Sequence, residues 1–269
     1  MCEALNVSRS GYYAFLKRPE SKRSRENKRL LEAIRKIHRE THEIYGSPRI
    51  TQSLQKDEKA SRGRVARIMR ENGIRSKTVK KYKATTNSKH NLPVADNLLN
   101  REFAAQRPNE KWVTDITYIQ TEEGWLYLAG VLDLYGRKLI GWAMDGRMKT
   151  ELVSTALKQA IGRTGARNSV LVHSDRGVQY ASEAYQRLLK SHGFICSMSQ
   201  KGNCYDNAPM ESFWGKLKTE WLNGRKFKTR AEAMKAVFDY IELFYNCRRI
   251  HSGNGYLPPA DYEILSNSA

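Results

Sequence analysis

The chain has 269 residues with 47 Lys and Arg against 28 Asp and Glu, which gives a formal net charge of +19. A hydrophobic content of 40% and a length that suits one large domain or two modest ones predict a folded protein with a real core. Asp133 interrupts the most apolar run, the N-terminal stretch has no long apolar segment, and the four cysteines form no CxxC pair. These features argue against a membrane-spanning, secreted or disulfide-stapled protein and favour a reducing, cytoplasmic compartment.

The positive charge is concentrated in the first part of the chain. Residues 1–100 contain 24 Lys and Arg against 10 Asp and Glu, whereas the remaining residues contain 23 against 18. A basic excess in one region indicates a polyanion such as nucleic acid as the partner. The alternatives are a solvated helical surface and, less favoured, an anionic membrane, because no strongly apolar helix face accompanies the basic runs.

Residues 1–95 are expected to form a basic, all-α region that binds DNA. A turn at 6–13 leads into a first helix, and apolar residues at helical spacing predict further helices over 26–43, 49–56 and 61–72. The last two suit a helix-turn-helix, in which the second helix enters the major groove of DNA. The arginines of that second helix that we expect to project outward are Arg62, Arg64, Arg67 and Arg70, and the first three are our candidate DNA contacts.

From residue 108 the pattern changes to that of an α/β domain, after a stretch at 96–107 that we interpret as a linker. β-branched and aromatic runs alternate with helical stretches, which predicts a mixed sheet with flanking helices over 108–269. The expected strands are 112–119, 125–133, 138–145, 169–173 and 194–199, and the expected helices are 150–161, 182–191, 207–221 and 230–246.

Three carboxylates lie near the ends of predicted strands or at the start of a helix, where sheets of this kind place catalytic and ligand-binding residues. Asp115 lies on the first predicted strand, Asp175 follows the fourth, and Glu211 lies near the start of a closing helix. Carboxylate oxygens are the ligands that hard divalent cations prefer, and two Mg²⁺ ions about 3.5–4 Å apart can clamp the attacking and leaving oxygens of a phosphodiester. The spacing alone is weak, because 28 acids in this chain produce such pairs by chance.

Longer motifs surround the three carboxylates. They read WVTDITY at 112–118, HSDRGVQY at 173–180, KGNCYDNAPMESFWGKLK at 201–218, YNCRRIHS at 245–252 and GYLPP at 255–259, with VSRSGYYA at 7–14 and YGSPRI at 45–50 upstream. In this order they resemble the DDE transposases of bacterial insertion sequences, specifically the catalytic OrfB-type product with a retroviral-integrase-like core. The resemblance covers nearly the whole chain, although Cys247 stands where an arginine is common.

The resemblance implies a ribonuclease-H-like fold and a catalytic, metal-binding triad of Asp115, Asp175 and Glu211. It implies a DNA contact at Lys218, which lies seven residues after Glu211 and so returns to the same helix face. It also implies that Mg²⁺ or Mn²⁺, as two ions, supports cleavage at the ends of a mobile element and strand transfer by the 3′-hydroxyl. Double-stranded DNA is the expected partner of a nucleoid-associated multimer, together with an upstream-frame product. Arg248 and Arg249 are further candidate DNA contacts.

Several residues near these motifs have competing interpretations. Asp133 and Asp145 lie near turns, where a solvated or capping carboxylate is the default, and Asp206 is interpreted as an N-cap that orders the loop before Glu211. His173 is interpreted as a contact near the site, with packing equally plausible. Phe213 and Trp214 are expected to pack in the core, although one of them can also stack on an unpaired base.

Two other functions remain open from the sequence. A non-catalytic DNA-binding regulator would use the same basic region, but the intact carboxylates favour an enzyme. A nuclease without strand transfer cannot be distinguished from a transposase by its residues. An assay for joined strands would separate these two.

Overall fold

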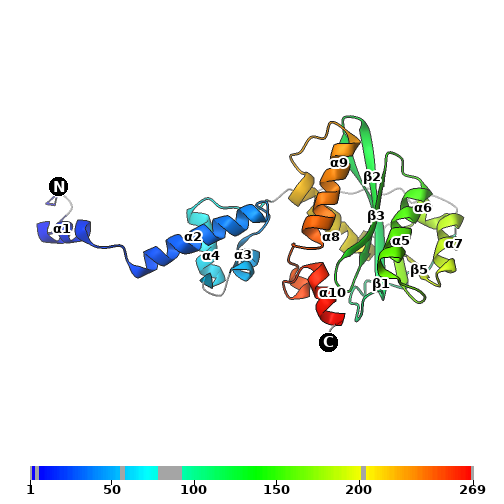
Figure 1. Cartoon of the computed structure of the whole chain (residues 1–269), viewed down its shortest axis with the longest axis horizontal. Coiled ribbons are helices and arrows are strands. Elements are labelled where there is room, and N and C mark those ends of the chain that lie inside the picture. Colours follow the sequence, from blue (N-terminus) through cyan, green and yellow to red (C-terminus); the bar gives the residue numbers. More distant parts are fainter. Residues whose placement is uncertain (1, 4–5, 55–57, 78–92, 201–203, 268–269) are drawn as a thin grey trace. The chain divides into compact units, whose positions relative to one another are not determined.

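The computed structural model of the chain describes residues 2–3, 6–54, 58–77, 93–200 and 204–267. They form two compact units, Met1–Lys77 and Thr78–Ala269 (Figure 1). The last part of the predicted basic region 1–95, residues 78–92, lies outside the described residues. No helix among the described residues is both long enough and apolar enough to cross a membrane.

The N-terminal unit is helical, as the sequence predicts. Its helices are α1 (Arg9–Lys17), α2 (Lys22–Glu40), α3 (Ser47–Ser53) and α4 (Arg62–Glu71). The side chains of Ser8, Ser21 and Ser61 cap α1, α2 and α4, because a hydroxyl oxygen can satisfy a backbone N–H that the first turn leaves unpaired. The apolar faces of α2, α3 and α4 pack together, and Ile34 and Ile50 are completely buried between them.

The C-terminal unit contains a five-stranded mixed sheet. Its strands are β1 (Lys111–Thr121), β2 (Gly124–Asp133), β3 (Leu139–Asp145), β4 (Leu171–Ser174) and β5 (Ile195–Met198). They lie in the order β3-β2-β1-β4-β5, with β1, β2 and β3 antiparallel and with β4 and β5 parallel to β1. This order confirms the predicted ribonuclease-H-like fold.

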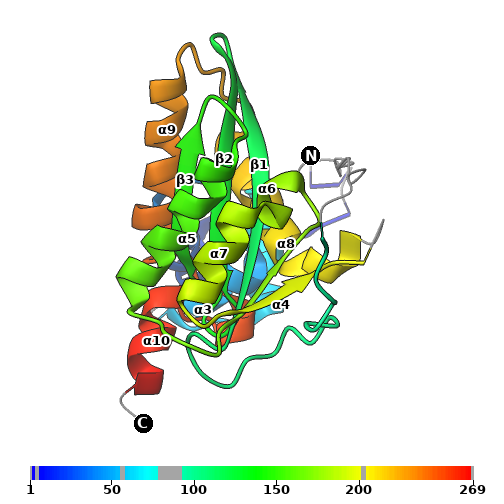
Figure 2. The same ribbon diagram turned by 90° about the vertical axis from the view of Figure 1, so that its right-hand side faces the viewer.

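Helices cover both faces of this sheet (Figure 2). On one face lie α5 (Thr150–Thr164), α6 (Val178–Ala181) and α7 (Glu183–Ser191), and on the other lie α8 (Ala208–Leu217) and α9 (Arg230–Phe238). Trp112 is completely buried under the first group, where it packs edge-to-face on Phe194. The sequence did not predict α6 or the C-terminal α10 (Pro259–Asn267).

The two helices on the second face continue as π-helical turns. The segment η3 (Lys218–Leu222) extends α8, and η4 (Asp239–Tyr245) extends α9. The predicted helices 207–221 and 230–246 therefore have nearly the right extent, but the change of winding was not predicted. Such π turns are frequent at functional sites, and Lys218 is the first residue of η3.

The stretch at 96–107 packs on the sheet unit. Leu99 is only 1% exposed, and the backbone N–H groups of Leu98 and Leu99 donate to Ser197 Oγ at 2.9 and 3.1 Å. The Lys111 ammonium donates to the backbone carbonyls of Glu102 and Ala104. These residues, which we expected to form a linker, thus belong to the surface of the C-terminal unit.

Candidate active site

Asp115 and Asp175 lie where β1 and β4 stop pairing. β4 runs parallel to β1, and the register ends near Val113 opposite His173. Each aspartate lies two residues beyond that pair, so the period of a strand directs both to one face. The loop after β4 holds Asp175 in place, because the N–H of Gly177 donates to Asp175 Oδ1 at 2.9 Å. The end of the parallel pairing thus gathers two carboxylates.

The first turn of α8 brings Glu211 to the same edge of the sheet. α8 packs on β1, and Pro209 lies in its first turn, where a fixed φ favours helix initiation. Just before the helix, Asn207 Nδ2 donates to the backbone carbonyl of Thr114 at 3.0 Å. This contact fixes the start of α8 next to Asp115 and so positions Glu211.

Trp214 connects α8 directly to Asp115. Its indole Nε1–H donates to Asp115 Oδ2 at 3.1 Å. Gly130 is the partner of Asp115 on β2, and a Cβ at this position would lie 2.8 Å from the Trp214 ring and 2.9 Å from Met210. The glycine therefore leaves the space in which α8 approaches the sheet closely enough for this hydrogen bond.

The three carboxylates repel one another. Burial and the negative charges of Asp175 and Glu211 together raise the pKa of Asp115 from 3.8 to about 8, against the lowering effect of the Trp214 hydrogen bond. Partial burial also raises the pKa of Glu211, although the residue is exposed overall. Like charges held together at a half-buried site are electrostatically unfavourable until a cation joins them.

Lys218 lies beside the carboxylates, as the helix period predicts. Burial lowers the pKa of its ammonium, and the nearby charge of Asp115 raises it. The same ammonium lies 4.9 Å from the centre of the Tyr118 ring, within cation–π range. Lys218 thus places one positive charge next to three acids, too little to neutralise them.

The donor set of this site fits hard divalent cations. All three candidate ligands are carboxylates, and Asp175 is half-buried while Glu211 is exposed. Within the described residues, no three His, Cys, Asp or Glu side chains are close enough together to hold one metal ion. Glu211 is exposed in the first turn of α8, and its charge reaches Asp115.

The competing acids have structural roles. Asp133 is completely buried and accepts from the N–H groups of Asn109 and Tyr135 at 2.8 and 2.9 Å, which confirms a loop-capping role and not a solvated one. Asp145 is exposed and accepts from the backbone N–H of Arg147.

Asp206 orders the loop before Glu211, as predicted, but it does not cap α8. Its buried carboxylate accepts from Gln200 N–H, Asn97 Nδ2 and Arg101 Nε at 2.8–3.0 Å. The N-cap position belongs to Asn207, so the predicted capping role is wrong.

His173 is a packing residue. It is completely buried, and its ring nitrogens lie 2.8 and 3.0 Å from the hydroxyls of Ser197 and Ser199. Burial lowers its pKa to about 4, so the imidazole is neutral at physiological pH. Of the two interpretations made from the sequence, packing is the one that these contacts support.

Arg249 is buried, which contradicts its predicted role as an accessible DNA contact. It is 1% exposed, and its guanidinium pairs with Glu220, with Nε donating to Oε2 at 2.7 Å. Tyr240 donates its hydroxyl to the same carboxylate at 2.9 Å. The charge of Arg249 is therefore used inside the fold, whereas the neighbouring Arg248 is exposed.

The arginines of α4 divide in the same way. Arg62 and Arg70 are exposed, as predicted, whereas Arg64 and Arg67 are half-buried. Arg64 pairs with Glu26 on α2 at 3.3 Å, and Arg67 pairs with an acid of its own helix at 3.6 Å. Arg64 is thus held partly against α2, whereas the ion pair of Arg67 lies on the surface of its own helix.

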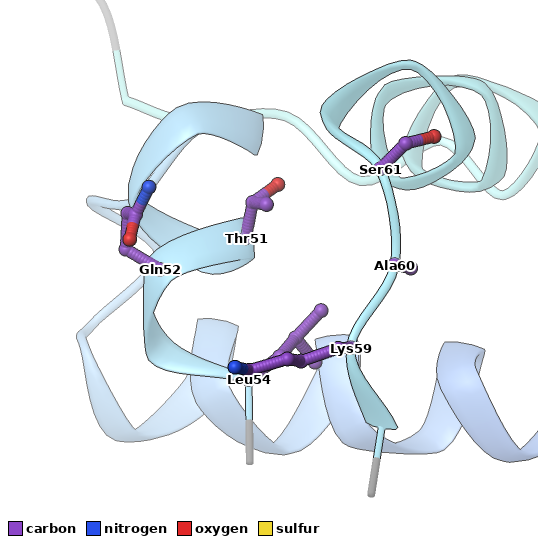
Figure 3. A pocket seen from close by; sticks show the side chains of 6 residues that line it. All are labelled: Thr51, Gln52, Leu54, Lys59, Ala60 and Ser61. Carbon is purple, nitrogen blue, oxygen red and sulfur yellow. The ribbon is translucent and has the colours of Figure 1, made fainter. Parts of the chain in front are cut away.

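A hollow lies between the end of α3 and the start of α4, at the turn of the helix pair (Figure 3). Its lining residues are Thr51, Gln52, Leu54, Lys59, Ala60 and Ser61. Ser61 also caps α4, one residue before the exposed Arg62. The hollow thus ends one residue before an exposed arginine of α4.

Sequence reasoning missed the contribution of Trp214 to the site. We expected this residue to pack in the core, and it is indeed 5% exposed, but it also donates to Asp115. A signal was present, because Trp214 lies three residues after Glu211 and therefore near its face of α8. Asn207 carried no such signal, since its partner lies 93 residues away on β1.

Comparison with known proteins identifies the family. The chain matches two integrase core domain families over residues 105–204 and 211–266, and an HTH-like domain family over residues 25–82. It is 42% identical over 266 residues to the transposase InsF for insertion sequence IS3A of Escherichia coli K12, covering 98% of this chain and 92% of InsF. The chain belongs to the InsF-type family of insertion-sequence transposases.

Two further proteins are similar to the chain. The transposase is 46% identical to the insertion element IS600 uncharacterized 31 kDa protein of Shigella sonnei, covering 97% of each chain. The catalytic core domain of HTLV-2 integrase, solved in complex with magnesium, is 15% identical with a TM-score of 0.46, covering 60% of this chain and 99% of that one. The family confirms the predicted enzyme class, a DNA transposase that cleaves and transfers strands.

Proposed function

We propose that Asp115, Asp175 and Glu211 are the catalytic carboxylates of this transposase and that they hold Mg²⁺ or Mn²⁺, as two ions. The observation that carries this proposal is the meeting of two aspartates at the end of the β1–β4 pairing with a glutamate from α8. Burial and repulsion by the other two carboxylates raise the pKa of Asp115, and a bound cation would relieve the repulsion. Bound ions would activate the attacking water or 3′-hydroxyl and stabilise the leaving oxygen of the phosphodiester.

The protein residues have distinct roles in this proposal. Asp115 lies within electrostatic reach of both other acids, which suits a ligand shared between two ions. Trp214 orients it by donating to Oδ2, and Gly177 orients Asp175. Lys218, which lies beside Asp115, would bind a phosphate of the reacting strand.

The DNA partner contacts both units in this proposal. The exposed Arg62 on α4 would bind phosphate or base edges, together with parts of Arg64 and Arg67 left accessible by their ion pairs. Arg248 is a further candidate on the sheet unit. Because two DNA ends have to be held together for joining, we infer a multimer on DNA, at the nucleoid, with an upstream-frame product as a possible component.

The proposal is tested with Glu211→Gln, which keeps the shape of the side chain and removes its charge. Asp145→Asn is the matched control, because Asp145 is an exposed acid of the same sheet that lies outside the carboxylate cluster. A labelled duplex that carries the element end is incubated with each protein, with and without Mg²⁺. Wild type and Asp145→Asn are expected to cleave and join strands only with metal, and Glu211→Gln to bind DNA without reacting.

Two results would overturn the proposal. Cleavage that survives in Glu211→Gln would mean that another carboxylate holds the metal. Binding without reaction in all three proteins, even with the upstream product added, would favour a DNA-binding regulator. Cleavage without joined strands would leave the carboxylates in place and reduce the function to that of a nuclease.

A further inference from the structure

Two large aromatic rings are exposed side by side on the hairpin formed by β1 and β2. Tyr118 is 38% exposed and Trp125 is 45% exposed, and their rings meet edge to face with centroids 5.0 Å apart. Cross-strand aromatic pairs stabilise a hairpin, but that role does not require both rings to remain open to water. Exposed paired aromatics of this kind are typical of surfaces that bind a ligand.

This pair is directly connected to the candidate active site. The Lys218 ammonium lies 4.9 Å from the centre of the Tyr118 ring and is within electrostatic reach of Asp115. A path from the carboxylates to Trp125 therefore passes Lys218 and crosses from one face of β1 to the other, because Asp115 and Tyr118 are three residues apart and point to opposite faces of the strand. A phosphate at the carboxylates would place its neighbouring nucleotide along this path.

The charges at the two ends of the path differ. Lys218 lies at the end next to the carboxylates, whereas Glu122 and Glu123 are exposed at the tip of the hairpin beyond Trp125. Arg230 lies between them, where its Nε–H donates to the Trp125 carbonyl and its backbone N–H donates to Glu123. The tip thus carries charges of both signs, so the contact that the exposed rings themselves offer is with a base and not with a phosphate.

We propose that Tyr118 and Trp125 form a stacking platform for one unpaired base of the DNA strand whose phosphate lies at the carboxylates. The proposal deepens the proposed function and rests on it. A half-buried carboxylate is reached more easily by a strand end that has left the duplex, and the base that is freed gains stacking on an aromatic face. Every base has such a face, so the platform is independent of sequence.

The platform is tested by the preference for frayed DNA over blunt DNA. The probes are a blunt duplex and the same duplex with a three-nucleotide overhang that carries 2-aminopurine, both bound by the full chain without divalent metal. The variant is Trp125→Leu, and the matched control is Phe238→Leu. Phe238 is also 45% exposed and also meets a tryptophan edge to face, Trp142, at 6.2 Å.

We expect wild type and Phe238→Leu to bind the overhang more tightly than the blunt duplex and to quench 2-aminopurine. Trp125→Leu should lose about tenfold in affinity for the overhang, with the blunt duplex unchanged, and should lose the quenching. Trp125→Phe should restore both. A general loss of folded protein would weaken binding of the two duplexes equally, so the ratio of the affinities reports the platform.

An unchanged ratio and unchanged quenching in Trp125→Leu would overturn the platform. An equal loss in Phe238→Leu would overturn it as well, since the effect would then belong to any exposed ring. Glu211→Gln separates this inference from the proposed function, because it should keep the overhang preference while it loses cleavage. Metal-dependent cleavage together with an unchanged ratio in Trp125→Leu would refute only the platform.

Discussion

Two groups of charged residues in the sheet unit contrast in how their charges are balanced. At the end of the β1–β4 pairing, Asp115, Asp175 and Glu211 form a group of like charges, with Lys218 beside them. Glu220 on η3, the extension of α8, and Arg249, which follows η4, form a buried pair of opposite charges. In the first arrangement the repulsion is relieved by a proton, as the raised pKa of Asp115 indicates, or by a bound cation, whereas the second arrangement is complete by itself.

The buried pair explains why the predicted DNA contact at Arg249 was wrong. Arg249 lies in a basic sequence after a helix, but Glu220 and the Tyr240 hydroxyl bind it inside the fold. The pair joins η3 to the segment after η4, and η3 begins with Lys218. The Glu220–Arg249 pair thus stabilises the π-helical segment η3, whose first residue, Lys218, lies beside Asp115.

The largest effect is expected from removing one charge of the unbalanced group. Asp175→Asn should reduce cleavage and joining by about a thousandfold or more, because the site loses a ligand and an electrostatic contribution to the transition state. The rate of strand cleavage with Mg²⁺ measures this effect, with Asp145→Asn as the control. A reduction of less than about tenfold would remove Asp175 from the triad.

Breaking the balanced pair should affect stability instead. Arg249→Leu leaves the buried Glu220 charge without its partner and should lower the free energy of unfolding by about 3–5 kcal/mol. The double variant Arg249→Leu/Glu220→Leu should recover much of this loss, as urea unfolding would show. If Arg249→Leu weakened only DNA binding and left stability unchanged, the sequence-based prediction would have been right after all.

The stability contributions of Asp115, which lies beside other acids, and of Asp206, which accepts hydrogen bonds, should depend on pH in opposite directions. In metal-free protein, the raised pKa of Asp115 gives a contribution to stability that is present below its unfolded pKa of 3.8 and is lost as the pH rises through about 8. Burial raises the pKa of Asp206, but hydrogen bonds from Gln200 and Arg101 outweigh it and lower the pKa, so its contribution is present above 3.8 and lost in acid.

The measurement is the urea midpoint of wild type, Asp115→Asn and Asp206→Asn in EDTA between pH 4 and pH 9. The urea midpoint of Asp115→Asn should rise relative to that of wild type as the pH increases toward 8. The midpoint of Asp206→Asn should lie furthest below that of wild type at neutral pH. Parallel pH profiles of the three proteins would contradict the contrast between the two acids.

The smallest effect concerns the arginines of α4. Arg62 is exposed, so Arg62→Gln should reduce the slope of log affinity against log salt by about one, as expected for a lost phosphate contact. Arg64 pairs with Glu26, so Arg64→Gln should change the slope less and lower the stability of the helical unit. Binding of a short duplex between low and physiological salt provides the slopes. An identical change of slope in both variants would contradict this division.

The sequence was sufficient for what depends on local pattern and motif order. Strands, most helices and the candidate positions Asp115, Asp175 and Glu211 follow from periodicity and from the surrounding motifs, and the structure places Asp115 within electrostatic reach of the other two acids. Contacts between distant residues could not be predicted. Arg249 and Glu220 are 29 residues apart, and Leu99 and Ser197 are 98 residues apart, so no local pattern marks either pair.

The most direct test of the unbalanced group is its response to a cation. Mg²⁺ at one hundred times its dissociation constant should stabilise wild type and Asp145→Asn by about 2.7 kcal/mol, measured as the shift of the unfolding transition against EDTA. In Glu211→Gln at the same Mg²⁺ concentration the shift should fall to a small fraction, because one ligand and one charge are gone. An equal shift in all three proteins, or none in wild type, would contradict the assignment of these carboxylates as the metal site.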